Sequence, residues 1–360
     1  MPYPDIASIE AEPLNCPLKI PFAIAGGVQT VAENVLIRIV LSDGTAGYGE
    51  AAPLPAFNGE TQTQALSAIE SAKPELMRKT PVSLRRCSQV LKKIIGPFAS
   101  ARAGLEMALL DAWTRRMRTP MRHFFGGFNS RLETDVTVPL MPPRPAGRWA
   151  SAWRRKGFKR LKIKLGSGFS EDLERVTAVH RSAPGCGLIL DANAGMRLSS
   201  AKKLIDRLER RGISPILFEQ PLPEDDWKGM SRLTQESRVP ICADEMVSSA
   251  KEALRVVHEK TARAINVKLM KCGLWEALQI VSIARAAGTQ LMMGGMVESL
   301  LAMTSAAHFA AGLGGFRFID LDTPLFFKEN PMSSSRHLRA CVYDLSGITS
   351  GIGVVPRNFL

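Results

Sequence analysis

The chain has 360 residues, of which 45% are hydrophobic and 22% charged, and its formal net charge is +13 at pH 7. This length and balance predict a globular protein with a substantial core, arranged as one large domain and a smaller one. The N-terminus MPYPDIASIEAEP does not resemble a signal peptide, and no stretch reaches the roughly 18 apolar residues of a membrane span. We therefore expect a cytoplasmic protein with no membrane partner.

The positive charge raises nucleic-acid binding as an alternative, because lysine and arginine attract phosphates of any sequence. The densest basic run, WRRKGFKRLKIK at 153–164, begins in a helical pattern and ends in an alternating strand, so its charges divide between solvent and interior. No nucleic-acid-binding motif accompanies it, and we predict no nucleic-acid partner. The six cysteines form no CxxC pair, which argues against a disulfide framework or a zinc site and favours small core residues.

The first part of the chain, residues 1–128, reads as an α+β unit. ENVLIRIVL at 33–41 alternates as a strand, Asp43-Gly44 marks a hairpin turn, and residues 101–117 form the clearest helix. The last part, residues 325–360, contains the strand-like RACVYDL and glycine-rich turns. We expect this C-terminal segment to complete a cap built on the N-terminal unit.

Residues 129–324 alternate short strands with amphipathic helices, the pattern of a parallel α/β architecture. Polar or small residues end the eight predicted strands and recur every 24 to 28 residues: Thr137, Lys164, Asp191, Glu219, Asp244, Lys268, Gly295 and Asp320. An open, doubly wound sheet would normally show a glycine-rich phosphate loop after its first strand, and the sequence has none there. The regular spacing therefore predicts a closed barrel.

Three carboxylates follow apolar runs on consecutive strands: Asp191 in LILDANAG, Glu219 in LFEQP and Asp244 in ICADE. Barrel enzymes place their reacting groups at these C-terminal strand ends. Converging carboxylates repel one another unless a cation neutralises them, and a ligand set of oxygens suits Mg²⁺ or Mn²⁺. We predict a divalent metal site with Asp191, Glu219 and Asp244 as ligands.

Lysines stand on the strands that flank these carboxylates. Period-two alternation directs Lys162 and Lys164 into the barrel on one side, and Asn266 and Lys268 on the other. Burial, a nearby cation and mutual repulsion are expected to lower lysine pKa values and so leave one amine neutral enough to act as a base. Lys164 and Lys268 would then flank the metal from opposite walls.

This arrangement predicts a proton-transfer reaction. A metal on a substrate carboxylate would stabilise the enediolate that forms when the neighbouring carbon loses its proton. One lysine would remove the proton, and the other would return one to the opposite face. The simplest outcome is inversion at the α-carbon.

These residues together resemble the enolase superfamily, within it the muconate-lactonizing-enzyme subgroup. The resemblance covers nearly the whole chain and implies an α/β fold, a (β/α)7β modified TIM barrel under an α+β capping domain. It implies that Lys164 is the base opposite Lys268, that Lys162 supports it and touches substrate, and that Thr137, Gly295 and Val297 contact substrate. The mandelate-racemase subgroup instead uses a histidine late in the barrel, whereas the five histidines here fall in helical or capping stretches.

The last strand narrows the resemblance. Asp320 and Asp322 in IDLDT alternate onto one side, and dipeptide epimerases use such a DxD to receive the substrate ammonium. The resemblance thus implies a Mg²⁺-dependent dipeptide epimerase that inverts the α-carbon of the C-terminal residue of an L,L-dipeptide. Two reactions of the same site remain open, o-succinylbenzoate synthesis and N-succinylamino acid racemisation, as does a basic binding protein on a barrel scaffold.

The side chain that the site serves is left open. Ala-Glu epimerases of this family carry an arginine in the N-terminal loop where Gly27 stands here, which argues against Ala-Glu specificity. The loop at 53–62 should close over the site and offers Phe57, Asn58 and Glu60. Glycine at 295 would let the peptide approach closely, and Asn193, Glu245 and Glu298 should surround the site. Besides a small dipeptide, a second copy of the chain is a possible partner.

Overall fold

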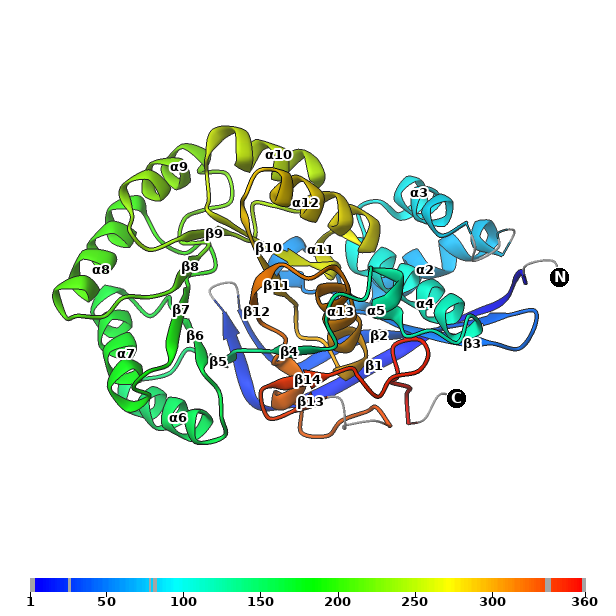
Figure 1. The fold of residues 1–360 in the computed structure, drawn as a ribbon, viewed down its shortest axis with the longest axis horizontal. Helices are drawn as coiled ribbons and strands as arrows, with labels where there is room; N and C mark the ends of the chain where they lie inside the picture. The colour runs from blue at the N-terminus through cyan, green and yellow to red at the C-terminus, as the bar shows by residue number, and fades with distance from the viewer. Residues whose placement is uncertain (1–3, 25–26, 78, 80–82, 334–337, 358–360) are drawn as a thin grey trace.

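The computed structural model describes residues 4–24, 27–77, 79, 83–333 and 338–357. A crescent of strands and outer helices forms one side of the molecule, and the N-terminal sheet with its helices forms the other (Figure 1). Within the described residues, no helix combines the length and the apolar character that crossing a membrane would require.

The N-terminal unit is an antiparallel sheet of β1 (Ile6–Ile24), β2 (Gly27–Leu41) and β3 (Ala46–Ala51), in that order. Helix α4 (Ala99–Arg116) lies directly on β3, because Gly47 and Gly49 have no side chain: an added Cβ would stand 2.1 Å from backbone atoms of α4. Around it pack α1 (Pro55–Asn58), α2 (Gln62–Leu76), α3 (Leu84–Ile95) and α5 (Met121–Phe124). The predicted strand at 33–41 and helix at 101–117 are confirmed.

All eight predicted barrel strands are present and parallel: β5 (Val136–Val138), β6 (Arg160–Lys164), β7 (Gly187–Asp191), β8 (Leu217–Glu219), β9 (Ile241–Ala243), β10 (Ala264–Lys268), β11 (Gln290–Gly294) and β12 (Phe316–Ile319). They neighbour one another in sequence order from β5 to β12. The ring closes where the Asp135 N–H donates to the Ile319 carbonyl at 2.9 Å. The predicted (β/α)7β barrel is confirmed.

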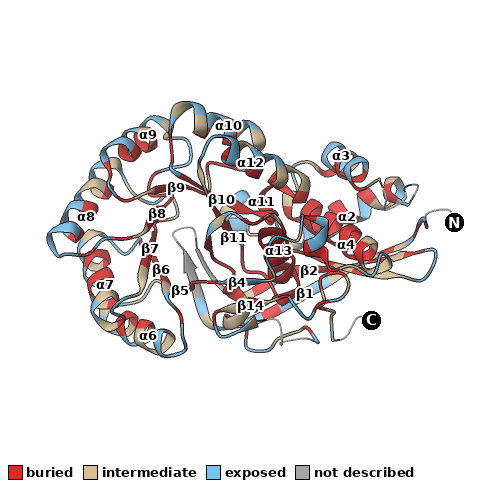
Figure 2. Cartoon of the chain, in the orientation of Figure 1, coloured by how far each residue is buried: buried red, intermediate tan, exposed pale blue. Residues whose placement is uncertain are grey.

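Helices follow the strands, and most of them have an exposed solvent face and a buried inner face, whereas the last one, α13 (Leu300–Leu313), is buried almost throughout its length (Figure 2). They are α6 (Pro143–Arg155), α7 (Phe169–Ser182), α8 (Leu198–Arg210), α9 (Trp227–Glu236), α10 (Ala250–Glu259), α12 (Leu274–Ala286) and α13 (Leu300–Leu313), with the short α11 (Leu269–Cys272) after β10. The basic run at 153–164 spans the end of α6 and all of β6, as predicted. Four histidines lie in helices, and His337 falls outside the described residues.

The barrel interior has an apolar layer below the predicted site. Ile189, Leu217, Cys242, Ala264, Met292 and Phe318 form one cluster, each at most 2% exposed. Asp191, Glu219, Asp244 and Asp320 each follow one of these residues by two positions, so strand alternation lifts them one pleat higher on the same inner face. The apolar layer thus closes the barrel floor, and the polar layer opens toward the cap.

The C-terminal segment contains η2 (Thr323–Phe326), β13 (Leu338–Arg339) and β14 (Val342–Asp344). Strand β14 pairs with β4 (Arg131–Glu133), the strand that leads into the barrel. The segment also meets the N-terminal unit, since the Lys328 N–H donates to the Pro17 carbonyl at 2.8 Å. The domain boundaries at 128 and 324 remain a prediction.

Candidate active site

A cavity of about 770 Å³ lies between the C-terminal ends of the barrel strands and the N-terminal unit. The barrel contributes Lys162, Lys164 and Lys268 to its wall, together with Thr137, Gly295, Val297, Asp320 and Asp322. The N-terminal unit contributes apolar side chains, among them Val31, Leu54 and Phe57. The structure therefore brings both predicted catalytic lysines and every predicted substrate contact to one cavity.

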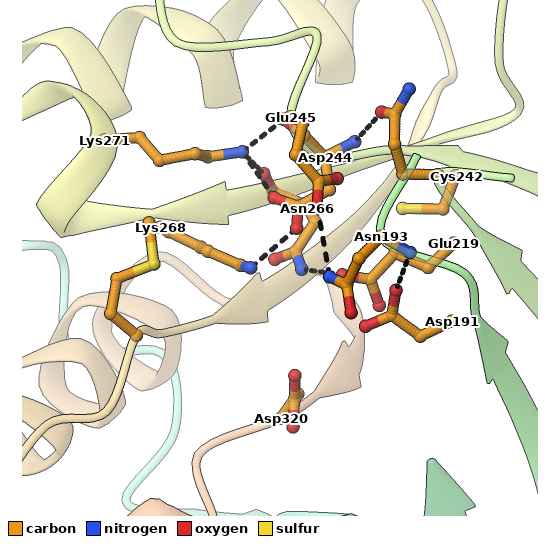
Figure 3. Close-up of polar contacts among 12 residues, drawn as sticks. Asp191, Asn193, Glu219, Cys242, Asp244, Glu245, Asn266, Lys268, Lys271 and Asp320 are labelled. Atoms are coloured by element: carbon orange, nitrogen blue, oxygen red, sulfur yellow. Dashed lines mark hydrogen bonds and ion pairs between the residues drawn. The ribbon is translucent and has the colours of Figure 1, made fainter. Parts of the chain in front are cut away.

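Asp191, Glu219 and Asp244 lie at the ends of β7, β8 and β9 and are fully buried; we call these three residues the carboxylate row (Figure 3). The ammonium of Lys164 lies 2.7 Å from Asp191, and that of Lys268 lies 2.6 Å from Asp244. The ammonium of Lys162 lies between two of the carboxylates, 2.9 Å from Asp191 and 2.8 Å from Glu219. Because β6 and β10 flank the three ligand strands, Lys164 and Lys268 approach the row from opposite ends.

Hydrogen bonds hold the backbone that follows the carboxylate row. Gln220 has a left-handed φ of 29°, and its side-chain oxygen Oε1 accepts a hydrogen bond from the Asp244 N–H at 2.8 Å, which ties the end of β8 to that of β9. Asn193, with φ 41°, donates its backbone N–H to the Asp191 carboxylate. Left-handed backbone at non-glycine residues is costly and concentrates at functional sites. Here it occurs directly after Glu219 and two residues after Asp191.

Lysine pairing decides the charge state of the row. Burial opposes ionisation of Asp191 and Asp244, yet nearby lysine charges hold the pKa of both carboxyls well below the ordinary value. For Asp191 the charges are mainly those of Lys162 and Lys164, and for Asp244 those of Lys268 and Lys271. Burial and the nearby Asp191 charge instead raise the pKa of Glu219 to about 8. Of the three carboxyls, Glu219 is therefore the one whose ionised form an additional cation would stabilise most.

The predicted fall of the lysine pKa values includes the charge of a bound metal ion, and the carboxylates by themselves shift the pKa values of Lys268 and Lys162 in the opposite direction. Burial works to lower the pKa of Lys268, but Asp244 and its acidic neighbours outweigh it and raise the pKa above its ordinary value. The pKa of Lys162 is likewise raised, because burial is outweighed by Asp191, Asp320 and Glu219. The number of carboxylates in reach, which alternation alone does not reveal, decides the direction.

Asp320 and Asp322 project onto one side of the chain after β12, as predicted, and both line the cavity. Asp320 forms an ion pair with Lys162 at 2.7 Å, and Asp322 accepts a hydrogen bond from the Thr137 N–H at 2.5 Å. Burial and the charge of Asp320 raise the pKa of Asp322 to about 7. Both residues are almost fully buried, so they are not a solvated strand end.

A further carboxyl, Asp135, stands behind this pair. Among the described residues, the acidic side chains with ligand atoms all within 4.8 Å of one another are Asp135, Asp320 and Asp322, which we call the Asp135 cluster. The carboxylate row does not form so tight a group, since the ammonium of Lys162 separates Asp191 from Glu219.

Two buried residues of the site were not predicted. Lys271 in α11 contacts Asp244 at 2.7 Å and the Asn266 carbonyl at 2.9 Å, and no strand alternation could reveal it because it follows a change to helix. Asp135 did have a signal: it precedes Thr137 by two positions, so the alternation that turns Thr137 inward applies to Asp135 as well.

One expectation about the surroundings is revised, a second gains another physical cause, and a third stays a prediction. Glu60 turns away from the cavity and accepts hydrogen bonds from Ser100 at the start of α4, while Phe57 of the same loop lines the cavity. A Cβ at Gly295 would stand 2.4 Å from Met303 and 2.8 Å from Glu298, so packing within the protein requires glycine there. Gly27 begins β2, but its surroundings lie outside what the structure describes.

The three expected neighbours of the site divide into two groups. Asn193 accepts a hydrogen bond from Lys164 at 2.9 Å and donates to Glu245 at 3.1 Å, so it orients that lysine directly. Glu298 is buried and accepts from the Met296 N–H at 2.7 Å, which shapes the loop that carries Val297. Asn193 and Glu298 therefore support opposite ends of the cavity.

Fold and site together define a capped (β/α)-barrel enzyme with lysines and carboxylates at the barrel mouth. The chain belongs to the mandelate racemase and muconate lactonizing enzyme family of the enolase superfamily. The model of the N-terminal domain of that family matches residues 8–126, and the model described as enolase C-terminal domain-like matches residues 146–357.

Similar proteins include enzymes named for dipeptides. The aromatic dipeptide epimerase of Herpetosiphon aurantiacus is 47% identical over 327 residues, which cover 91% of this chain and 92% of that protein. The L-Ala-D/L-Glu epimerase of Bacillus subtilis, solved as a substrate complex, superposes with a TM-score of 0.95 at 32% identity and covers 99% and 100% of the two chains. The Enterococcus faecalis dipeptide epimerase, solved with Mg and L-Leu-L-Tyr, gives a TM-score of 0.94 at 31% identity, covering 97% and 99%.

Proposed function

We propose that this protein is a Mg²⁺-dependent dipeptide epimerase, an isomerase that inverts the α-carbon of the C-terminal residue of an L,L-dipeptide by two-lysine proton transfer. The observation that carries the proposal is the placement of Lys164 and Lys268 on opposite walls of one cavity. A single base can only remove and return a proton on one face, whereas two opposed lysines allow inversion. The named relatives support the same reaction class.

Asp191, Glu219 and Asp244 are the proposed metal ligands, and their chemistry fits a hard divalent cation. All three are buried carboxylates on adjacent strands, and the Oδ1 atom of neighbouring Asn266 and the Oε2 atom of Glu245 have no hydrogen-bond partner among the described residues. The bound ion, Mg²⁺ or alternatively Mn²⁺, would stabilise negative charge on the substrate carboxylate as the α-proton leaves. It would also supply the counter-charge that Lys162 now gives to Asp191 and Glu219.

The lysines would divide the proton transfer between the two faces of the α-carbon. Loss of a carboxylate partner to the cation would weaken the forces that keep Lys268 protonated, because Asp244 is the leading cause of its raised pKa. The side-chain oxygen Oδ1 of Asn193 accepts a hydrogen bond from the Lys164 ammonium and so holds Lys164 in place. Each lysine can then act as the base for one epimer and as the acid for the other.

Asp320 and Asp322 are the proposed receptors of the substrate ammonium, and Thr137, Lys162, Gly295 and Val297 are proposed substrate contacts. Two carboxylates at one end of the cavity match a cation at fixed reach from the reacting carbon. An o-succinylbenzoate synthase has no ammonium to place there, and an N-succinylamino acid has its nitrogen blocked. The DxD therefore favours a free-amine dipeptide over these two alternatives.

We further propose that the second residue of the dipeptide is neutral and apolar. The cations among the described lining residues are the three lysines of the reacting centre, while the cap side offers Val31, Leu54 and Phe57. Acidic residues Glu33, Glu224 and Asp225 also line the cavity; they would repel a glutamate side chain and make a cationic second residue the alternative. L-Ala-L-Glu should accordingly be a poor substrate.

None of the six cysteines, all of which the structure describes, forms a disulfide, which agrees with a reducing compartment, and we propose the cytoplasm as the location.

Incubation with mixtures of L,L-dipeptides, Mg²⁺ and deuterated water tests the proposal. We expect L,D-dipeptides that carry one deuterium at the α-carbon of the second residue, detected by mass spectrometry and resolved chromatographically. Apolar second residues should dominate the products. Absence of exchange across a broad library, with Mg²⁺ binding confirmed by calorimetry, would contradict the proposed function.

A further inference from the structure

Asp135 is a fully buried carboxyl outside the proposed catalytic and metal-binding sets. It precedes β5, and its backbone N–H donates to the Ile319 carbonyl, the residue directly before Asp320. The neighbouring Thr134 hydroxyl accepts from the Leu321 N–H at 2.8 Å, between the two aspartates of the DxD. The closure of the barrel thus fixes Asp135 against the DxD.

The members of the Asp135 cluster differ in their partners. Asp320 pairs with Lys162 at 2.7 Å, and Asp322 accepts from the Thr137 N–H. Both oxygens of Asp135 are buried and lack a hydrogen-bond partner among the described residues, although they lie within reach of the other two carboxyls. Asp320 and Asp322 line the cavity, whereas Asp135 is not among its lining residues.

Three ionised carboxylates at this spacing would repel one another strongly. The ion pair described for the cluster joins Asp320 to Lys162, whose ammonium is also shared with Asp191 and Glu219. Burial and the charges of Asp320 and Asp322 raise the pKa of Asp135 well above its ordinary value. A carboxyl that keeps its proton becomes a hydrogen-bond donor, and the nearby acceptors are the DxD oxygens.

We infer that Asp135 is a positioning residue of the amine site: a neutral carboxylic acid whose O–H donates to the DxD carboxylates and holds them toward the cavity. No proton is transferred in turnover. This inference rests on the proposed function, since the DxD is there the receptor of the substrate ammonium. It adds a third, hidden carboxyl to the two that the substrate touches.

Two substitutions separate this role from alternatives. Asp135→Asn keeps the shape and replaces the O–H donor by an amide N–H donor, so KM for a free-amine dipeptide should stay within about threefold of wild type. Asp135→Leu removes the donor, so KM should rise about tenfold or more while kcat changes less, the cost of one lost hydrogen bond to a charged group. The Mg²⁺ affinity of both variants, measured by calorimetry, should match wild type and reports that the fold is intact.

An infrared difference spectrum between wild type and Asp135→Asn provides a readout independent of turnover. At neutral pH wild type should show the carbonyl band of a protonated carboxyl, shifted in deuterated water and lost in the variant. Absence of that band, or an Asp135→Asn variant that raises KM as far as Asp322→Asn does, would overturn the inference. If wild type epimerises no dipeptide but shows the band, the proposed function fails while the proton assignment stands.

Discussion

Two groups of buried acids lie at the mouth of the barrel, and they differ in how many lysines they contact. The carboxylate row lies among Lys162, Lys164, Lys268 and Lys271, and the pKa values of Asp191 and Asp244 are lowered. The Asp135 cluster meets only Lys162 within the described part of the chain, and the pKa values of Asp135 and Asp322 are raised. Aspartates thus ionise readily where several lysines surround them, as at Asp191 and Asp244, and hold a proton more firmly at Asp135 and Asp322.

The difference matches the two cations proposed for the site. Ionised Asp191 and Asp244 suit a divalent metal that must displace lysine ammonium groups, whereas Asp322, with a pKa of about 7, suits a singly charged substrate ammonium. Ion pairs at the row have a second consequence, since they hold the catalytic lysines in place before substrate arrives. The following predictions remove one group at a time from each wall.

The largest effect is expected from Asp244→Asn. The change deletes a metal ligand and a partner of both Lys268 and Lys271, so kcat/KM should fall by about 1000-fold or more, as for loss of several kcal/mol of Lewis-acid stabilisation. Calorimetric Mg²⁺ titration and steady-state epimerisation measure it. Asp206→Asn, an exposed acid on α8, is the matched control and should leave both unchanged. Chelation of wild type should reproduce the loss, and added Mg²⁺ should reverse it.

At the other wall, Asp322→Asn should reduce kcat/KM for free-amine dipeptides by about ten- to a hundredfold, the range for a hydrogen bond to a charged group. The same dipeptides with an acetylated amine gain nothing from the carboxylate, so their rates should change little. The ratio of the two substrates is the measured quantity. An equal loss for both would show that Asp322 shapes the barrel rather than the amine site.

The pH dependence of KM should reveal the same residue with a smaller effect. The pKa of Asp322 is raised to about 7, so it is protonated below that pH and ionised above it. KM for a free-amine dipeptide should therefore rise several-fold as the pH falls from 8 to 6, because the neutral acid attracts an ammonium less strongly. Asp322→Asn should flatten this part of the profile. A KM that instead falls toward acid would contradict the assignment.

Glu298 is a buried carboxyl outside both groups, and its ionisation should change the stability of the folded state. Burial raises its pKa from 4.5 to about 8. Between these values the folded state keeps a proton that the unfolded state releases, so stability should fall as the pH rises from about 5 to 8. Glu298→Gln should reduce the corresponding fall in Tm by a few degrees, as measured by calorimetric scans. Identical slopes in both proteins would exclude this titration.

Sequence periodicity predicted the barrel and most of the site because both depend on strand alternation. Eight apolar runs at similar spacing predicted the strands. Asp191, Glu219, Asp244 and Asp320 each follow a residue of the apolar layer by two positions, so alternation also predicted that they point inward. Strand alternation did not predict that Lys271 lies in the site, because the chain changes to helix after β10. Periodicity could not predict the direction of the Lys268 pKa shift, because this direction depends on how many carboxylates from other strands surround the lysine.

Loops were predicted less well than strands. Nothing periodic in the 53–62 loop distinguishes Glu60, which binds the start of α4, from Phe57, which faces the cavity. Gly295 was assigned to a close approach of substrate, and its packing against Met303 and Glu298, a second cause for glycine there, was not predicted. Such choices depend on residues far apart in the sequence.

The most direct test of the two-lysine account uses Lys164→Ala and Lys268→Ala in deuterated water with the separated L,L and L,D epimers of one good dipeptide substrate. Neither variant should interconvert the epimers, since each retains a base on only one face of the α-carbon. Each should exchange the α-proton of one epimer only, and the two variants should prefer opposite epimers, as read by NMR or mass spectrometry. Exchange of the same epimer by both variants, or undiminished epimerisation by either, would contradict the account.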